Sequence, residues 1–561
     1  MKAYKRLTYI SLGLATMLIY ACTNKFDEFN EDPNRATEVL TPSIMTQLQR
    51  NIAYNYYDSW QGLRMYGVIG QQWTQRTYTN EDRYNFAART GTVSNYFNWV
   101  YTYSELGNKI SIMIEKDPIG TASFGDNKMQ IATVEILKAW LMFQNVQTFG
   151  DVPYTEANDI EKYPNPKYDK QDFIYKALVT KLKEINTTLL GVSDDEGWTS
   201  GDVIFEGNVE GWRRFANSLR LQIAMRLSNV ESTYSATEAD AAIADGVMED
   251  NDDNAVFRFL RSGEPNESSK YNTYLSRMDF LPSWQFVNLL HGRDDDNIGF
   301  HNPFNGIFDP RFVQFVQSPA DQRTGLTPKV GAIPMGLSTN PNNRVWSLLP
   351  SATRITYGPT ATKADDVLPK PVQAAMWSTL LDYPNVALLM AERELNKGNA
   401  TECRDLFEEG IQASMDVWEV PVPDASAYLN DVLDLFDATD DEGKFEMIIT
   451  QKYIHNFAHF DQECVFEYRR TEYPKSLVMP GQVTGGTYAV GDYPPGVTSG
   501  PRPLVQLVFN ISGGNQQGFL QRMMYPTTEK STNEDQVTEA IKSIGGDTQY
   551  IPLYYSKKYK K

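Results

Sequence analysis

The chain has 561 residues, of which 41% are hydrophobic and 12% aromatic, enough to build a large buried core. Lysine and arginine total 52 against 71 aspartate and glutamate, giving a formal net charge of -19, which disfavours nucleic acid and anionic lipid headgroups as ligands. Besides Cys22 only Cys403 and Cys464 occur, so at most one disulfide can form between them, and packing must hold the fold.

The N-terminal segment has the layout of a secretory signal. Basic residues precede about fifteen mostly apolar ones, a run shorter than the ~20 residues that span a membrane. Cys22 follows directly, and Ile19 and Ala21 fit the aliphatic and small positions of a bacterial lipobox, whose cysteine thiol takes a diacylglyceryl group. We therefore predict a lipoprotein signal peptide over residues 1–21 and lipidation at Cys22, where several acyl chains would hold the protein on a membrane.

An extended tether and then an ordered domain are predicted after the signal. Residues 22–40 are acidic and poor in aliphatic side chains, so they should not fold by themselves. Order is expected over 41–561, because Thr41 and Pro42 supply a helix N-cap and a first-turn proline. Apolar residues then recur at helical spacing in four segments, which predicts buried helix faces. These segments contain Ile44, Leu48 and Ile52; Val134, Leu137 and Leu141; Ile174, Leu178, Leu182, Ile185 and Leu189; and Trp212, Phe215, Leu219 and Ile223.

Candidate ligand residues gather in the polar segment QQWTQRTYTNEDRYNF, residues 71–86, which has no helical apolar stripe. Sugar rings have apolar faces edged with hydroxyls, so a glycan site needs flat aromatic rings with hydrogen-bonding side chains beside them. With 10 Trp, 32 Tyr and 27 Phe in the chain, a place in the core is the alternative for each ring. The predicted ligand-binding residues are Trp73, Arg76, Tyr78, Arg83, Tyr84, Tyr271, Tyr274 and Trp346.

The later part of the chain predicts one helical hairpin and two loop-rich insertions. Residues 383–418 read as two helices joined at Lys397, Gly398 and Asn399, a hairpin of the tetratricopeptide kind, although no clean period of about 34 residues occurs elsewhere. Gly, Pro, Asn and Asp are dense at about 230–370 and 476–520. We predict long loops there, and loops of such length are often functional.

The sequence contains no complete enzyme motif of the kinds considered below. His455, His459 and Glu463 would share one face if residues 444–464 were helical, but the segment reads H-N-F-A-H and lacks the glutamate of H-E-x-x-H. We therefore predict a polar helix face without a metal. No G-x-S-x-G, P-loop or G-x-G-x-x-G is present, and although a pair of carboxylates could always lie close, no local motif marks a glycosidase. The prediction is a protein that is not an enzyme and needs no cofactor.

A structural calcium ion is the one cofactor that the sequence keeps as an alternative. Asp250, Asp252 and Asn254 match the first three positions of an EF-hand, but the turn glycine and the bidentate acid are missing. The run RDDDN at 293–297 is also rich in oxygen ligands. A solvated acidic loop is the favoured interpretation of both stretches.

Seven segments, in order along nearly the whole chain, resemble the SusD/RagB family of nutrient-binding outer-membrane lipoproteins, most closely its second, SusD-like branch. The position of Glu472 is usually a glycine in that family. The segments are FDEFNEDPN at 26–34, FGDVPYTEA at 149–157, YDKQDFIYKALVTKL at 168–182, GWRRFANSLRLQIAMRLS at 211–228, DPRF at 309–312, QKYIHNFAHFDQECVFEYRRTEYP at 451–474 and QRMMYPTTEKSTN at 521–533.

The resemblance implies a mainly all-α, tetratricopeptide-like scaffold whose long loops form the ligand face. It also implies an outer-membrane protein, lipid-anchored and facing outward, that holds an oligosaccharide or polysaccharide ligand for a SusC-like TonB-dependent transporter. An oligopeptide binder of the same uptake system and a structural surface lipoprotein remain alternatives. Glu467, Arg469 and Arg470 follow a helix and precede a proline turn. We assign them to architecture, because guanidinium groups there cap helix ends or pair with acids.

Overall fold

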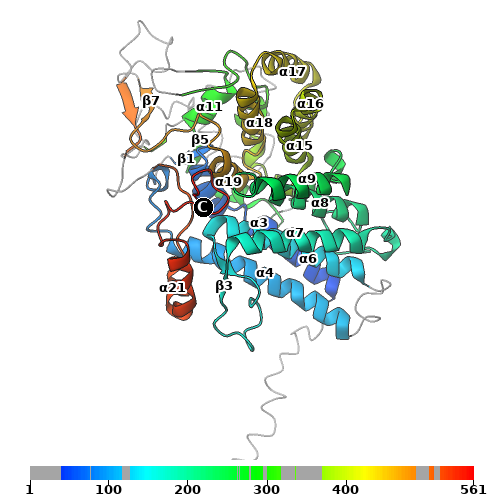
Figure 1. Cartoon of the computed structure of the whole chain (residues 1–561). Coiled ribbons are helices and arrows are strands. Elements are labelled where there is room, and N and C mark those ends of the chain that lie inside the picture. The colour runs from blue at the N-terminus through cyan, green and yellow to red at the C-terminus, as the bar shows by residue number, and fades with distance from the viewer. Residues whose placement is uncertain are drawn as a thin grey trace, which may run out of the picture.

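The computed structural model describes residues 40–75, 78–116, 127–261, 263, 266–276, 279–294, 300–316, 335–336, 369–487, 505–510 and 518–560. Helices dominate this part of the chain, as predicted (Figure 1). The helices are α3 Thr41–Asn55, η1 Ser59–Gly67, η2 Glu81–Arg83, α4 Thr90–Lys116, α6 Lys128–Phe149, α7 Gln171–Leu189, η3 Asp194–Glu196, α8 Val209–Arg226, α9 Ser232–Ala244, η4 Asn251–Asp253, α10 Ser269–Ser276, α11 Trp284–Leu290, α12 Arg311–Val316, η8 Lys370–Val372, α15 Tyr383–Lys397, α16 Ala400–Val417, α17 Val422–Asp437, α18 Asp441–His455, α19 Asp461–Thr471, α20 Thr527–Thr532 and α21 Glu534–Ser543.

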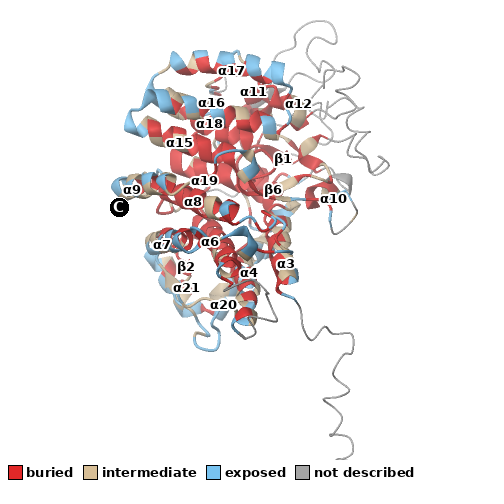
Figure 2. Ribbon diagram, turned by 90° about the vertical axis from the view of Figure 1, so that its right-hand side faces the viewer, coloured by how far each residue is buried: buried red, intermediate tan, exposed pale blue. Residues whose placement is uncertain are grey.

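Consecutive helices pack against one another and form a continuous array. α4 packs on α6, α6 on α7, α7 on α8 and α8 on α9, after which α8 contacts α15 and α15 packs on both α16 and α18. Figure 1 shows α4, α6, α7 and α8 stacked in layers below α15, α16 and α18. In Figure 2 the buried residues run through the inside of this stack, while α9 and α17 expose their outer faces. The array is the tetratricopeptide-like scaffold that the resemblance implied.

The predicted hairpin at 383–418 is confirmed as α15 and α16. Gly398 ends α15 with φ 75°, the left-handed conformation that glycine adopts without a steric penalty. The two helices approach closely, because a Cβ added at Gly410 would lie 2.8 Å from Cγ of Leu388. Cys403 on α16 and Cys464 on α19 are both free and buried, so they do not pair.

In the described part of the chain, four antiparallel two-stranded ladders form, and two of them, β1–β5 and β4–β6, join segments far apart in sequence. In the β1–β5 ladder, Trp73 faces Pro282 and Gln75 faces Phe280, which fixes the polar segment after η1 beside α10 and α11. The other ladders pair β2 with β3, β4 with β6 and β7 with β8. The strands are β1 Trp73–Gln75, β2 Val152–Pro153, β3 Tyr168–Asp169, β4 Ala255–Arg258, β5 Phe280–Pro282, β6 Trp377–Leu381, β7 Val483–Thr487 and β8 Val505–Val508.

The described part of residues 230–370 contains α9, α10, α11 and α12 between its loops, and a loop-rich insertion there stays a prediction. α9 forms because its sequence STYSATEADAAIA is rich in alanine, the best helix former, despite the Asn and Asp residues that follow it. The predicted signal and tether, with Cys22, lie outside the described residues, apart from Leu40. No helix in the described part of the chain is both long and apolar enough to cross a bilayer.

Candidate ligand-binding site

Three of the predicted ligand-binding rings lie in the core. Trp73 is 2% exposed and stacks on Phe457 with ring centroids 4.6 Å apart. Tyr84 is 1% exposed, and its hydroxyl accepts a hydrogen bond from Nε2 of Gln71. Tyr271 is likewise 1% exposed. The prediction that these rings stack on a sugar does not fit the geometry, because packing already covers both of their faces.

The remaining predicted residues divide between the surface and the undescribed part. Tyr78 is 44% exposed and keeps a ring available to solvent. Arg83 supports its own turn, since Nε donates to the carbonyl of Thr79 and Nη2 to Oδ1 of Asn80. Arg76, Trp346 and the side chain of Tyr274 lie outside the described residues. Tyr78 is therefore the predicted ring that the structure places on the surface.

A second exposed ring, Trp60, was not among the residues predicted from the sequence to bind a ligand. It is the second residue of η1, a π-helix, which is a rare conformation that is frequent at functional sites. Oδ1 of Asp58 caps this helix by accepting from the backbone N–H groups of Trp60 at 2.8 Å and Gln61 at 2.7 Å. Trp60 is 47% exposed. The signal in the sequence was a tryptophan flanked by polar residues in DSWQ.

Arg64 connects the two exposed rings. Its guanidinium carbon lies 4.6 Å from the ring centroid of Trp60 and 5.8 Å from that of Tyr78. It also lies 5.3 Å from the centroid of Phe280, which is buried beneath it on β5. At these distances the ring quadrupoles attract the cation. The guanidinium group is thus held among three rings, two of which face solvent.

Carboxylates complete this surface. Nη1 of Arg64 lies 4.0 Å from Oε1 of Glu81, and Nη2 lies 4.0 Å from Oδ2 of Asp279. Arg89 forms an ion pair with Glu81, and its guanidinium carbon lies 5.5 Å from the centroid of Trp60. We name the set the Trp60–Tyr78 face. It consists of Trp60, Arg64, Tyr78, Glu81, Arg89 and Asp279.

A buried carboxyl group fixes the loop that presents Tyr78. Oδ2 of Asp82 accepts a hydrogen bond of 2.7 Å from the hydroxyl of Thr74 and one of 2.9 Å from the backbone N–H of Gln75. Burial raises the pKa of Asp82 to about 7. Because Thr74 and Gln75 belong to β1, Asp82 ties the turn after Tyr78 to the strand.

The histidine pair of the H-N-F-A-H segment forms a closed, buried cluster with Asp382. His455 bonds Oδ2 of Asp382 through Nε2 at 2.9 Å and Oγ of Ser414 through Nδ1 at 2.9 Å. His459 bonds the carbonyl of His455 through Nε2 and the hydroxyl of Thr379 through Nδ1, both at 2.7 Å. The ligand atoms of the three residues converge as in a metal site. Every ring nitrogen already has a protein partner, however, so this geometry favours a structural polar cluster.

The segment around these histidines is not one continuous helix, because α18 ends at His455 and α19 begins at Asp461. Glu463 does not face the histidines. Its carboxylate accepts two hydrogen bonds of 2.7 Å from Nη2 of Arg226 instead. The prediction of a common face for His455, His459 and Glu463 is therefore wrong.

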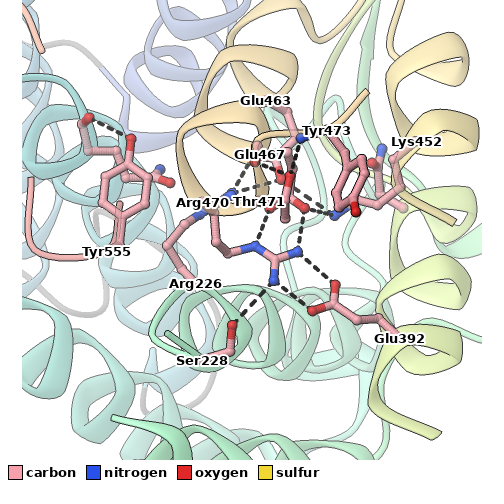
Figure 3. A network of polar contacts seen from close by, with 12 residues as sticks. Arg226, Ser228, Glu392, Lys452, Glu463, Glu467, Arg470, Thr471, Tyr473 and Tyr555 are labelled. Atoms are coloured by element: carbon pink, nitrogen blue, oxygen red, sulfur yellow. Dashed lines mark hydrogen bonds and ion pairs between the residues drawn. The ribbon is translucent and has the colours of Figure 1, made fainter. Parts of the chain in front are cut away.

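Glu467 and Arg470 belong to a buried ion network, as predicted (Figure 3). Arg470 binds Glu392 through Nη1 at 2.6 Å and Nη2 at 2.7 Å, and Nη2 also reaches Glu467 at 2.6 Å. Nζ of Lys452 lies 3.1 Å from Glu467, on which Arg226 also converges. The network joins α8, α15, α18 and α19. These side chains stabilise the scaffold.

Arg469 has an architectural place of its own beside that network. Its Nε donates to the carbonyl of Leu520 at 2.8 Å, and its Nη1 donates to the carbonyl of Gln147 at 3.1 Å. It therefore ties α19 to α6 and to the C-terminal segment. The assignment of Arg469 to the architecture is confirmed by these bonds.

In the oxygen-rich turn at 250–254, side-chain oxygens accept hydrogen bonds from backbone N–H groups. Oδ1 of Asp250 accepts from the backbone N–H of Asp252 at 2.8 Å, and Oδ1 of Asn254 accepts from the backbone N–H of Tyr383 at 2.6 Å. These bonds build the turn η4 and its junction with α15. Most of the second acidic run, 293–297, lies outside the described residues. The solvated acidic loop stays the predicted interpretation of both stretches, with calcium as its alternative.

Comparison with known proteins gives one consistent result. Residues 33–487 match the model of the SusD-like family, described as starch-binding and associating with the outer membrane. A chitin-binding SusD homologue from Flavobacterium johnsoniae superposes with a TM-score of 0.62 at 20% identity, over 92% of this chain and 98% of that one. A SusD homologue from Parabacteroides distasonis gives a TM-score of 0.67 at 19% identity, over 92% and 98%. No curated protein sequence matches the chain significantly.

Proposed function

Because the chain belongs to the SusD-like family of outer-membrane-associated binding proteins, we propose that it captures a glycan for nutrient uptake on its Trp60–Tyr78 face. The observation that carries the proposal is the pair of half-exposed rings held beside one buried guanidinium group. Exposed aromatic rings offer apolar faces to the C–H faces of a sugar, and guanidinium N–H groups donate to its hydroxyls. The fold relatives include a chitin-binding protein, which supports a glycan as the ligand class.

Two further parts of the proposal concern delivery. Lipidation at Cys22 would hold the protein on the outer membrane, facing outward, because several acyl chains bind a bilayer more strongly than one. A SusC-like TonB-dependent transporter would take the ligand across. Tethering close to that transporter raises the local ligand concentration, so a modest affinity is sufficient.

The test compares two variants on native gels that contain soluble polysaccharides. Trp60→Ala should abolish the retardation that a cognate polysaccharide causes in the full-length protein. Phe173→Ala, which removes a ring on α7 that is also 47% exposed, should leave that retardation unchanged. Equal retardation of wild type and Trp60→Ala would overturn the assignment of the face. Peptides that co-purify with the protein, with no polysaccharide bound, would favour the oligopeptide alternative.

A further inference from the structure

The charges of the Trp60–Tyr78 face cancel one another. Arg64 lies between Glu81 and Asp279, and Arg89 forms its ion pair with Glu81. The side chains of Arg64, Glu81 and Asp279 are 7%, 1% and 7% exposed, so solvent screens them little. Two guanidinium groups therefore meet two carboxylates, and their formal charges sum to zero.

We propose that this face takes uncharged glycans and rejects acidic ones, an inference that rests on the proposed function. A uronate or sulfate group would need a cation whose charge is not already balanced, whereas Arg64 and Arg89 both have acidic partners. The ligand's negative charge would also approach Glu81 and Asp279 in a weakly screened setting, where like charges repel strongly. A neutral sugar avoids both costs. Its hydroxyls can accept from guanidinium N–H groups while its ring lies against Trp60 or Tyr78.

Two features outside the Trp60–Tyr78 face also disfavour an acidic glycan. The next arginine of the loop, Arg83, donates to the carbonyl of Thr79 and to Asn80 within its own turn. The whole chain carries a formal net charge of -19, which repels a polyanion before it reaches the face. Both the local charge balance and the long-range field therefore disfavour an acidic glycan.

The experiment uses matched pairs of ligands. Hyaluronan and polygalacturonate are each run beside their carboxyl-reduced forms, which keep the linkages but lose the charge, together with starch, xylan and glycol chitin as neutral probes. Retardation of the full-length protein is measured on native gels at low and high salt. Wild type should bind a neutral polymer at least tenfold more tightly than any acidic one.

Two variants then shift the charge balance at the face. Asp279→Asn and Glu81→Gln each leave a guanidinium group with one acid fewer, so each should raise affinity for the acidic polymers at least tenfold at low salt, with the gain lost at high salt. Asp195→Asn changes the net charge equally on the exposed turn η3 and should change nothing. Melting curves show whether each variant is folded. The comparison of neutral and acidic polymers binding to wild type does not depend on any variant.

The outcomes separate the two proposals. Wild type that binds an acidic polymer as tightly as its carboxyl-reduced form would overturn the charge-selection inference alone, because glycan capture would still stand. A protein that binds none of the polymers, neutral or acidic, would overturn the proposed function and the inference with it. Acidic binding that Asp195→Asn raises as much as Asp279→Asn would also contradict the inference, since net charge would then explain the gain.

Discussion

Arg470 and Arg64 are both almost fully buried, yet their surroundings differ. Arg470 makes hydrogen bonds of 2.6–2.7 Å to two carboxylates, Glu392 and Glu467, deep among α15, α18 and α19. Arg64 lies 4.0 Å from each of its two carboxylates and is surrounded by rings, two of which are half exposed. Short bidentate pairs fix a guanidinium group and use its donors. The pairs at Arg64 are longer, and its guanidinium group lies against two half-exposed rings, so the two arginines distinguish scaffold from binding surface.

The largest effect is expected from breaking the buried network. Arg470→Ala would leave the buried carboxylate of Glu392 without its ion-pair partner, while Glu467 keeps Lys452 and Arg226; an uncompensated buried charge costs about 3–5 kcal/mol of unfolding free energy. Urea unfolding followed by circular dichroism measures the loss. Arg404→Ala removes an exposed pair with Asp437 and should cost at most about 1 kcal/mol. Equal losses in the two variants would show that the network does not support the scaffold.

A pH effect is expected next, from the histidine cluster of the scaffold. Burial lowers the pKa of His459 to about 3. An unfolded histidine has a pKa of about 6.5, so between these values only the unfolded state binds the proton and stability falls as the pH falls. From pH 7 to pH 5 this group should cost wild type about 2 kcal/mol of unfolding free energy.

The measurement is the difference in unfolding free energy between wild type and His459→Asn at pH 7 and pH 5. Asparagine does not titrate, so the stability advantage of wild type should shrink on acidification. Asp82 titrates in both proteins and cancels from the difference. A constant difference between the two pH values would mean that His459 is not buried in its neutral form.

At the binding surface, the conservative change Arg64→Lys should reduce glycan affinity about tenfold, equivalent to about 1.4 kcal/mol. Lysine keeps the charge but loses the planar group that lies against Trp60 and Tyr78. Isothermal titration with the cognate neutral polysaccharide measures the effect. The matched variant Arg470→Lys should lower the melting temperature and leave affinity unchanged. If affinity falls for Arg470→Lys and stability for Arg64→Lys, the comparison between the two arginines is wrong.

The smallest effect concerns Glu472, which ends α19 with φ 63° in the left-handed region. A non-glycine residue there is strained, so Glu472→Gly should stabilise the protein by about 0.5–1 kcal/mol, less what the exposed ion pair with Lys558 contributes. Thermal melting checks this, with Lys558→Ala to measure the pair alone. A lower melting temperature for the glycine variant than for Lys558→Ala would contradict the expectation.

Most of the fold could be predicted from local signals in the sequence. Gly398 marks the end of α15, apolar spacing marks the helix faces, and the family resemblance placed a glycine where Glu472 adopts its left-handed conformation. The architectural role of Arg470 was also expected from the proline turn that follows it, although Arg470 lies within the last turn of α19 and not after a helix. Apart from the family resemblance, each of these features depends on residues close in sequence, so it can be predicted from one chain alone.

The candidate site depends instead on contacts between distant segments. Trp73 looked like a ligand platform, but β1 pairs with β5 and the ring stacks on Phe457, more than 380 positions along the chain. Trp60 was missed although Arg64 lies four positions further along η1, because the sequence does not show that Tyr78, from another segment, lies beside the same guanidinium group. Composition can indicate that a segment is rich in rings, but it does not show which rings the fold leaves exposed.

The most direct test of the account is a crystal structure of the protein with the neutral oligosaccharide of its cognate polysaccharide. We expect a sugar ring in van der Waals contact with Trp60 or Tyr78, and a hydroxyl within hydrogen-bonding distance of Arg64. An oligosaccharide bound with full occupancy at another surface, with the Trp60–Tyr78 face empty, would contradict the account.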